Sequence, residues 1–115
     1  MNDTVLEKKC VPCEGGVAAL TAEEVSQQLT QLDSAWQAGA AAKQITREFS
    51  FKNYYHCMAF VNAVAWLAHA ENHHPDMEVY YDRCVVHYTT HAISGLSEND
   101  FICAAKVDLL YAMRY

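Results

Sequence analysis

The sequence predicts an α+β domain in which three helices pack on one face of a four-stranded antiparallel sheet. Two pairs of strand-like segments flank one long helical segment, and the two outer helical segments begin with capping residues, which gives the order α-β-β-α-β-β-α. The chain has 115 residues, of which 52% are apolar, and this suits one domain with its own core. We therefore treat residues 1–115 as a single domain with a polar N-terminal extension over residues 1–20.

The first helix is expected to begin after Thr21 and to end near Asp33. Thr21 and Glu24 have the spacing of a capping box, in which each side chain satisfies a backbone N–H group of the first turn. The apolar residues that follow share one helical face: Val25, Leu29 and Leu32. A stripe of this kind normally faces the core.

Two strands are expected to follow the first helix. Residues 45–51 alternate between two faces, which is typical of a half-buried strand. One face carries Ile45, Phe49 and Phe51, with Arg47 as the misfit. Residues 34–37 are expected to pair with this strand through a turn near Gly39, although the alanines between them favour helix.

A long helix and a hairpin come next. Asn53 is a suitable N-cap for a helix from Tyr54 to about Asn72, and Pro75 ends it because proline disfavours helical geometry in the preceding residue. Residues 78–81 and 85–91 are rich in Val, Tyr and Thr, which indicates two strands joined by a short link.

The last helix is expected to start after Ser97, because Ser97 and Asp100 repeat the capping-box spacing. A carboxylate at this position stabilises a helix N-terminus by itself, so we favour a structural role for Asp100 over a functional one. The apolar face of this helix carries Ile102, Ala105, Leu109 and Met113. With all helices on one face, the other sheet face stays partly apolar or seeks a partner, so we expect an oligomer.

The formal net charge is −6, from 8 basic and 14 acidic side chains. Such a chain offers no basic face for direct contact with nucleic acid, and docking on an anionic membrane is disfavoured as well. Residues 1–9 lack the apolar region of a signal peptide, and the most apolar stretch, 58–70, is too short to span a bilayer. The five cysteines form an odd set, which favours a reducing, cytoplasmic compartment.

Histidines are concentrated in one region, since five of the six lie between positions 69 and 91. His73 and His74 lie at the expected end of the long helix, and His87 and His91 are expected to share a strand face. Imidazole titrates near neutral pH, so a cluster of histidines at a cleft edge suits acid–base catalysis.

Other roles for these residues stay open. Two other interpretations are that the histidines serve only in packing or at the surface, and that they bind a metal ion. His69 and His73 have ligand spacing, but Ala70 stands where a metalloprotease helix has its glutamate. Cys10 and Cys13 form a Cys-x-x-Cys pair without the second pair that a zinc site needs, so we expect a structural or incidental role for them.

The residues around the histidines form a longer pattern. It reads His69-x-x-x-His73-His74-Pro75-x(5)-Tyr81-x(9)-His91-x(8)-Asp100. This pattern resembles the signature of the pterin-4a-carbinolamine dehydratase family. The similarity covers about residues 20–113 and includes Trp36, the pair Thr90-His91 and the segment Gly95-Leu96-Ser97.

The resemblance implies a four-stranded antiparallel sheet with three helices on one side, in a homodimer or a homotetramer. It implies dehydration of 4a-hydroxytetrahydropterin to quinonoid dihydropterin, which recycles the pterin cofactor of aromatic amino acid hydroxylases. No metal or organic cofactor would be required.

The resemblance also implies the site. The catalytic residues would be His73, His74 and His91, with His73 and His91 as acid and base in either order and His74 orienting the substrate. The substrate-binding residues would be these three with Pro75, Met77 and Thr90, and the supporting residues Ser97 and Asp100. Met77 departs from the family, in which tryptophan is common at this position, and methionine cannot stack as a flat ring does.

Two further functions stay open. Some family members bind a homeodomain transcription factor and stabilise its dimer, so the chain would then be a non-catalytic binding module that uses a protein partner. A relative that binds pterin without catalysis, such as a chaperone of pterin-dependent enzymes, is the other alternative. An aromatic amino acid hydroxylase is a further candidate partner. The complete histidine trio favours the enzyme.

Overall fold

The computed structural model describes residues 8–10 and 18–113. Its elements are α1 (Ala22–Leu29), β1 (Gln37–Ala38), β2 (Ile45–Ser50), α2 (Tyr54–Glu71), β3 (Asp76–Val79), β4 (Arg83–Tyr88), the 3-10 helix η2 (His91–Ile93) and α3 (Glu98–Ala112). Apart from η2, this is the predicted order of elements. Most of the expected N-terminal extension, including Cys13, lies outside the described residues.

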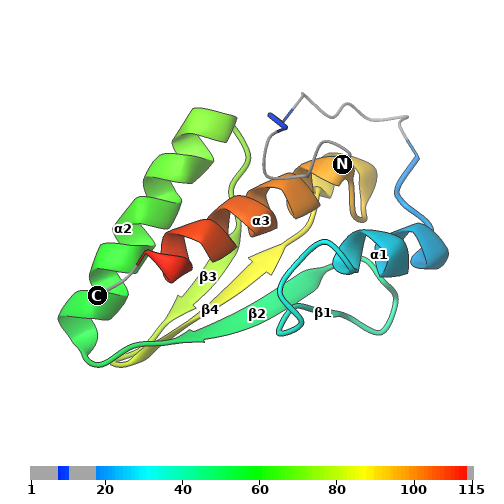
Figure 1. Ribbon diagram of the computed structural model, residues 1–115. Coiled ribbons are helices and arrows are strands. Elements are labelled where there is room, and N and C mark those ends of the chain that lie inside the picture. The colour runs from blue at the N-terminus through cyan, green and yellow to red at the C-terminus, as the bar shows by residue number, and fades with distance from the viewer. Residues whose placement is uncertain (1–7, 11–17, 114–115) are drawn as a thin grey trace.

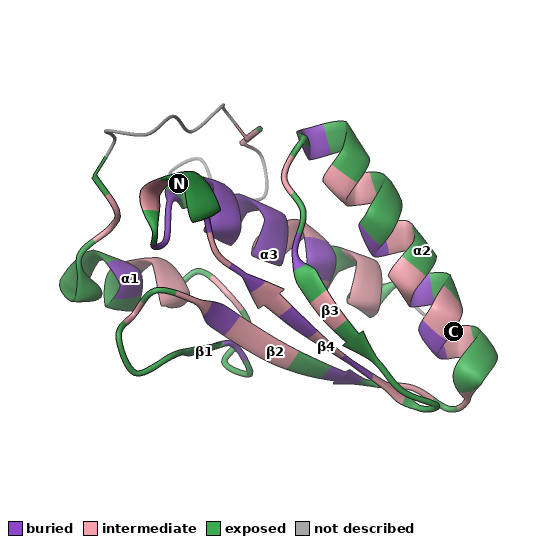
Figure 2. Ribbon diagram, turned by 180° about the vertical axis from the view of Figure 1, so that it is seen from behind, coloured by how far each residue is buried: buried purple, intermediate pink, exposed green. Residues whose placement is uncertain are grey.

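The sheet has the order β1-β2-β4-β3, and all neighbouring strands are antiparallel. In Figure 1 α3 crosses in front of the strands, and in Figure 2, seen from behind, the strands lie in front of α3. The helices therefore cover one face of the sheet, which confirms the predicted α+β class. Among the described residues, no helix is both long and apolar enough to cross a membrane.

Side chains alternate along each strand between the core and the opposite face of the sheet, which none of the described helices covers and which is the bare face. In β4, Cys84, Val86 and Tyr88 are fully buried under the helices, while the residues between them point to the other face. The core continues through Ile45 and Phe49 of β2. The helices contribute mainly Phe60, Val64, Phe101, Ile102 and Val107.

Arg47, the misfit of the predicted strand, lies on the helix-facing side of β2. Its guanidinium is 4.4 Å from the centroid of the Phe49 ring and 2.7 Å from Asp108 Oδ1, and its side chain is only 10% exposed. Trp36 Nε1 donates a second hydrogen bond of 2.8 Å to the same oxygen. Burial raises the pKa of Asp108 despite these hydrogen bonds. A buried guanidinium is tolerated here because an aromatic face and a carboxylate replace its water.

Two boundaries near the N-terminus differ from the prediction. α1 ends at Leu29 rather than near Asp33, and the chain continues in turns. β1 occupies Gln37–Ala38 rather than residues 34–37. Asp33 is the cause, because its side chain accepts a hydrogen bond from the Ala35 N–H and its carbonyl accepts one from Trp36. These bonds hold the first residues of the predicted strand in a turn.

The boundaries of the second hairpin also differ from the prediction. β3 begins at Asp76 and β4 at Arg83, each two residues before the prediction, so the link between them keeps its predicted length of three residues. The Tyr80 N–H donates to Arg83 O at 2.9 Å across this turn. β4 ends at Tyr88 rather than at His91. The prediction that His87 and His91 share a strand face is therefore wrong, since His91 begins η2.

We predict that Asp108→Ala lowers the free energy of unfolding by about 3 kcal/mol, because it leaves the buried Arg47 charge without its carboxylate. The measurement is urea denaturation followed by circular dichroism. Asp33→Ala is the matched control, since Asp33 is 3.7 Å from the same guanidinium but half exposed. We expect a loss of about 1 kcal/mol or less for it. Equal losses in the two variants would contradict this account of Arg47.

Candidate active site

A cavity of about 350 Å³ lies where the end of α2, the end of β4, η2 and the start of α3 meet. It is lined by Cys10, Glu71, Asn72, His73, His74, Thr89, Thr90, His91, Ala92 and Asn99. Four of the residues expected at the site, His73, His74, Thr90 and His91, therefore line one cavity. They come from segments almost twenty residues apart in sequence.

The end of α2 places the histidine doublet. Asn72 caps the helix in the left-handed conformation, with φ 53° and ψ 42°, which asparagine tolerates better than most residues. The His73 N–H then donates to Ala68 O at 3.1 Å, which turns the chain away from the helix axis. Pro75 prevents any return to helix. His73 and His74 thus leave the helix at its last turn and enter the cavity wall.

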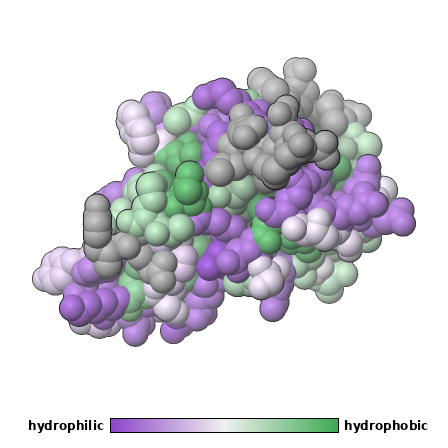
Figure 3. All heavy atoms as spheres, viewed as in Figure 1, coloured by the Kyte–Doolittle hydropathy of each residue, from purple (hydrophilic) through white to green (hydrophobic). Residues whose placement is uncertain are grey.

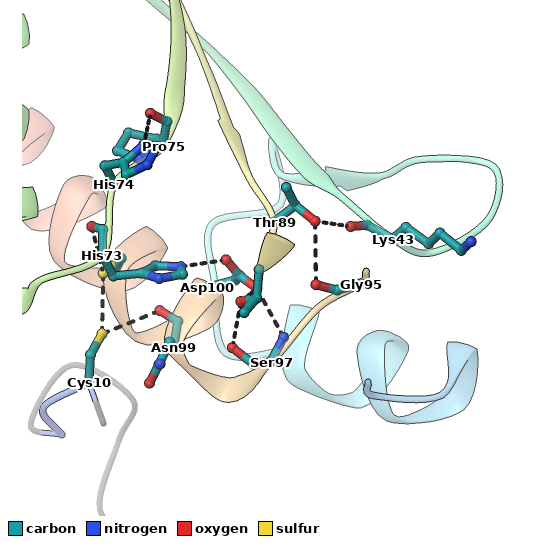
Figure 4. A network of polar contacts seen from close by, with 12 residues as sticks. Cys10, Lys43, His73, His74, Pro75, Thr89, Gly95, Ser97, Asn99 and Asp100 are labelled. Carbon is teal, nitrogen blue, oxygen red and sulfur yellow. Dashed lines mark hydrogen bonds and ion pairs between the residues drawn. The ribbon is translucent and has the colours of Figure 1, made fainter. Parts of the chain in front are cut away.

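His73 is held by a buried carboxylate. Its Nε2 lies 2.7 Å from Oδ1 of Asp100, whose side chain is fully buried. Oδ2 of Asp100 accepts hydrogen bonds from Thr90 Oγ1 at 2.8 Å and from the Ser97 N–H at 2.9 Å. Figure 4 shows His73 and Ser97 directed at the Asp100 carboxylate. On its flat side the His73 ring stacks on Tyr88, with centroids 5.9 Å apart and an interplanar angle of 8°. Asp100 therefore caps α3 and also fixes an imidazole.

These contacts determine which nitrogens are available for proton exchange. A carboxylate or carbonyl oxygen can only accept, so His73 Nε2 donates to Asp100, and His74 Nδ1 donates to Pro75 O at 3.1 Å. In each ring the other nitrogen remains for a proton or a ligand: Nδ1 of His73 and Nε2 of His74.

His91 is presented by a closed loop. Thr90 and Gly95 form an isolated antiparallel bridge, with Thr90 N–H donating to Gly95 O at 2.8 Å. The loop between them contains η2, in which His91 is exposed. Gly95 is required because a Cβ there would lie 2.7 Å from the Cβ of Ala19. This loop places His91 in the lining of the cavity.

Other predicted site residues lie outside the cavity lining. The Pro75 carbonyl orients His74, and Ser97 and Asp100 lie behind His73 and Thr90. Met77 belongs to β3, pairs with Val86 and packs against the core. The prediction also missed part of the lining. Glu71 had a usable signal, since it is an acidic residue at the end of an otherwise apolar helix.

The remaining histidines lie elsewhere. His87 points to the bare sheet face, where Nε2 contacts Glu78 and Nδ1 lies 2.8 Å from Thr46 Oγ1. The His69 ring packs against Trp66 on α2, with centroids 5.4 Å apart. Within residues 8–10 and 18–113, no group of three or more His, Cys, Asp or Glu side chains is placed to hold a metal ion.

Glu71 links three parts of the molecule beside the cavity. Its Oε1 accepts the Cys10 N–H at 2.9 Å, and its Oε2 lies 2.7 Å from Lys106 Nζ of α3 and 4.0 Å from Lys9 Nζ. Burial by itself would raise the pKa of Glu71, but the Cys10 N–H and Lys106 outweigh it and lower the pKa. The charged carboxylate therefore ties the N-terminal segment and α3 to the end of α2.

Comparison with known proteins identifies the family of this chain. The family model described as "Pterin 4 alpha carbinolamine dehydratase" matches residues 18–110. The chain belongs to this family. The match includes every described residue of the cavity wall except Cys10, which lies before it.

Several relatives of the pterin carbinolamine dehydratase family are similar over almost their whole length. A protein of Nitrosomonas eutropha named "Putative pterin-4-alpha-carbinolamine dehydratase" is 64% identical over 104 residues, which is 90% of each chain. One of the same name from Legionella pneumophila (strain Corby) is 53% identical over 110 residues, covering 96% of this chain and 97% of the relative. A crystal structure described as "transcriptional coactivator/pterin dehydratase from Brucella Melitensis" has a TM-score of 0.76 at 32% identity, covering 81% of this chain and 98% of that chain.

We predict that Glu71→Gln lowers the free energy of unfolding by about 1–2 kcal/mol at pH 7, because the Lys106 charge loses its carboxylate partner. The folded-state pKa of Glu71 is lowered, so its contribution is present above the unfolded pKa of about 4.3 and is lost as the pH falls through the folded pKa. Between pH 7 and pH 3 the Tm of the variant should therefore fall by less than the Tm of the wild type. An unchanged acid profile would contradict the assignment.

Proposed function

We propose that this protein is a 4a-hydroxytetrahydropterin dehydratase, which releases water to form quinonoid dihydropterin by histidine acid–base catalysis. The observation that supports this most strongly is the cavity with three histidines on its walls, one of them fixed by the buried carboxylate of Asp100. Membership of the pterin carbinolamine dehydratase family supports the same reaction class. In this proposal the dehydration is one step in recycling the tetrahydropterin cofactor of aromatic amino acid hydroxylases, and no metal or organic cofactor takes part in it.

The reaction needs one proton donor and one proton acceptor. The carbon–oxygen bond of the carbinolamine breaks as the hydroxyl takes a proton and leaves as water, and a ring nitrogen of the pterin gives up a proton. We assign these two transfers to His73 and His91, which approach the cavity from different elements. Asp100 accepts a hydrogen bond from His73 Nε2 throughout, so the ring stays oriented while Nδ1 exchanges a proton.

His74 has a different part in this proposal. Its Nδ1 is occupied by the Pro75 carbonyl, so Nε2 is the nitrogen that can polarise the leaving hydroxyl or hold the ring. The cavity volume of about 350 Å³ lies within the range of sites for small molecules and suits a bicyclic pterin. We also place the protein in the cytoplasm, where a reducing environment suits the free thiols of Cys57 and Cys84.

The test is an absorbance assay of quinonoid product formation from freshly generated 4a-hydroxytetrahydropterin. We expect the wild type to exceed the uncatalysed rate by at least about 10²-fold, and His73→Ala and His91→Ala each to lose most of that acceleration. His74→Ala should lose it as well. His87→Ala is the matched control, because this histidine lies on the bare sheet face and should keep the wild-type rate.

A second arm of the assay tests the carboxylate. Asp100→Asn keeps the shape of the side chain but weakens the orientation of His73, so we expect kcat to fall by about 10-fold or more. Wild-type protein that is folded but gives no acceleration would exclude the dehydratase. A histidine variant within about threefold of the wild-type rate would exclude the role assigned to that residue.

Exposed apolar surface supports a second proposal, contact with a protein partner. Tyr55 and Trp66 of α2 are 79% and 70% exposed, and eleven residues, or three helical turns, separate them, so they share one face. An apolar groove of about 270 Å³ runs between α2 and α3, and Figure 3 shows apolar side chains over these helices. We propose that a homodimer or homotetramer contacts another copy here. The Brucella relative, described as a coactivator too, makes a different protein partner the alternative.

Light scattering after size exclusion measures the assembly. We expect Trp66→Glu to reduce the molar mass of the wild-type oligomer, because a charge on this face opposes its burial. Tyr81→Glu changes an aromatic of similar exposure in the β3–β4 turn and should leave the mass unchanged. A monomeric wild type, or an oligomer unaffected by Trp66→Glu, would contradict self-association through this face. Dehydratase activity measured in parallel separates loss of assembly from loss of folding.

A further inference from the structure

Two thiols from opposite ends of the chain meet beside the cavity. Cys10 Sγ lies 3.4 Å from Cys103 Sγ, although 93 residues separate them in sequence. Cys10 lines the cavity, whereas Cys103 lies in α3 and is fully buried. Cys10 Sγ is also 3.6 Å from the carbonyl oxygen of Asn99, as Figure 4 shows.

Two further contacts hold the N-terminal segment at Cys10 and just before it. The Cys10 N–H donates to Glu71 Oε1 at 2.9 Å, and Lys8 Nζ lies 2.6 Å from Glu98 Oε2. These contacts fix the segment to the end of α2 and to the first turn of α3. The two sulfurs therefore meet through an anchored backbone.

We infer that Cys10 and Cys103 form a thiol–disulfide exchange site, at which a small-molecule disulfide such as oxidised glutathione converts the two thiols into an internal disulfide. A disulfide bond is about 2.05 Å long, so the sulfurs must approach by about 1.4 Å, which side-chain rotation can supply. This chemistry is independent of the dehydratase proposal.

The exchange takes two steps. In the first, Cys10 loses its proton and its sulfur attacks one sulfur of the small disulfide, so the S–S bond breaks and one small thiolate leaves and takes up a proton. In the second, Cys103 loses its proton and its sulfur attacks the Cys10 sulfur, which expels the second small thiolate. The two protein thiols are oxidised, and one small disulfide is reduced to two thiols.

Access and acidity set the order of these steps. Cys10 is reached through the cavity, but no surface of Cys103 is open to a reagent. The hydrogen bond with Cys10, together with burial, raises the pKa of the Cys103 thiol, which makes it a poor nucleophile toward solutes. Cys103 therefore reacts only with the neighbouring Cys10 sulfur, as a resolving cysteine.

The site also predicts a consequence for the cavity. In the mixed disulfide, the small thiol is bonded to a wall residue and occupies the space beside His73 and His91. Formation of the internal disulfide releases this group and reopens the cavity. Cys103 thus protects the histidines from lasting blockage by a thiol adduct.

The experiment treats the full chain with oxidised glutathione, quenches it by acid and alkylation, and analyses its peptides by mass spectrometry. We expect the wild type to give a peptide pair linked through Cys10 and Cys103. Cys103→Ala should instead accumulate one glutathionyl group on Cys10. Cys13→Ser should behave as the wild type, and Cys10→Ser should give neither product.

A link between Cys10 and Cys13 in place of the expected pair would overturn the inference, and so would the absence of any product at Cys10. Thermal unfolding provides a second measurement that needs no variant. A bond closing so long a loop should raise the Tm of the oxidised wild type by at least about 5 °C over the reduced protein. An equal Tm for the two forms would show that the native sulfurs are not joined.

Discussion

The fold and the cavity both depend on the hydrogen bonds that the buried carboxylate of Asp100 accepts. Its oxygens accept hydrogen bonds from the helix-end histidine His73, from Thr90 after β4 and from the backbone of Ser97 at the start of α3. A charge without solvent is costly unless every lone pair finds a donor, so these three segments are stable only in one relative arrangement. The helix cap and the cavity wall are consequently the same structure.

The pleat of β4 decides which histidines reach the cavity. Tyr88 faces the helices and provides the surface on which His73 stacks, whereas His87 beside it faces away and contacts Glu78. Because neighbours in a strand point to opposite faces, a shift of one residue in register would exchange these two side chains. The buried residues of β4 thus fix its register and, with it, the surroundings of His73.

Local signals predicted the helix starts well and the loops poorly. The caps Thr21, Asn53 and Ser97 mark the three helix starts because each acts on backbone groups within its own first turn. The doublet was found from its position before Pro75 and from the family pattern. The setting of His91 was missed because η2 depends on the Thr90–Gly95 bridge, and Glu71 was missed because its partners come from both ends of the chain. Contacts of this range leave no periodic trace in the sequence, and the one local signal for Glu71 was its charge at the end of an apolar helix.

The bare face of the sheet has a practical consequence. Its side chains pair among themselves, as His87 does with Glu78 and Arg83 with Glu48, and none of the described helices covers them. The layer of buried residues lies between this face and the helices that carry the cavity. A fluorophore attached to this face, for example at position 48, would label the molecule, and a linker attached there would immobilise it. Either attachment would leave the opposite side open to small molecules.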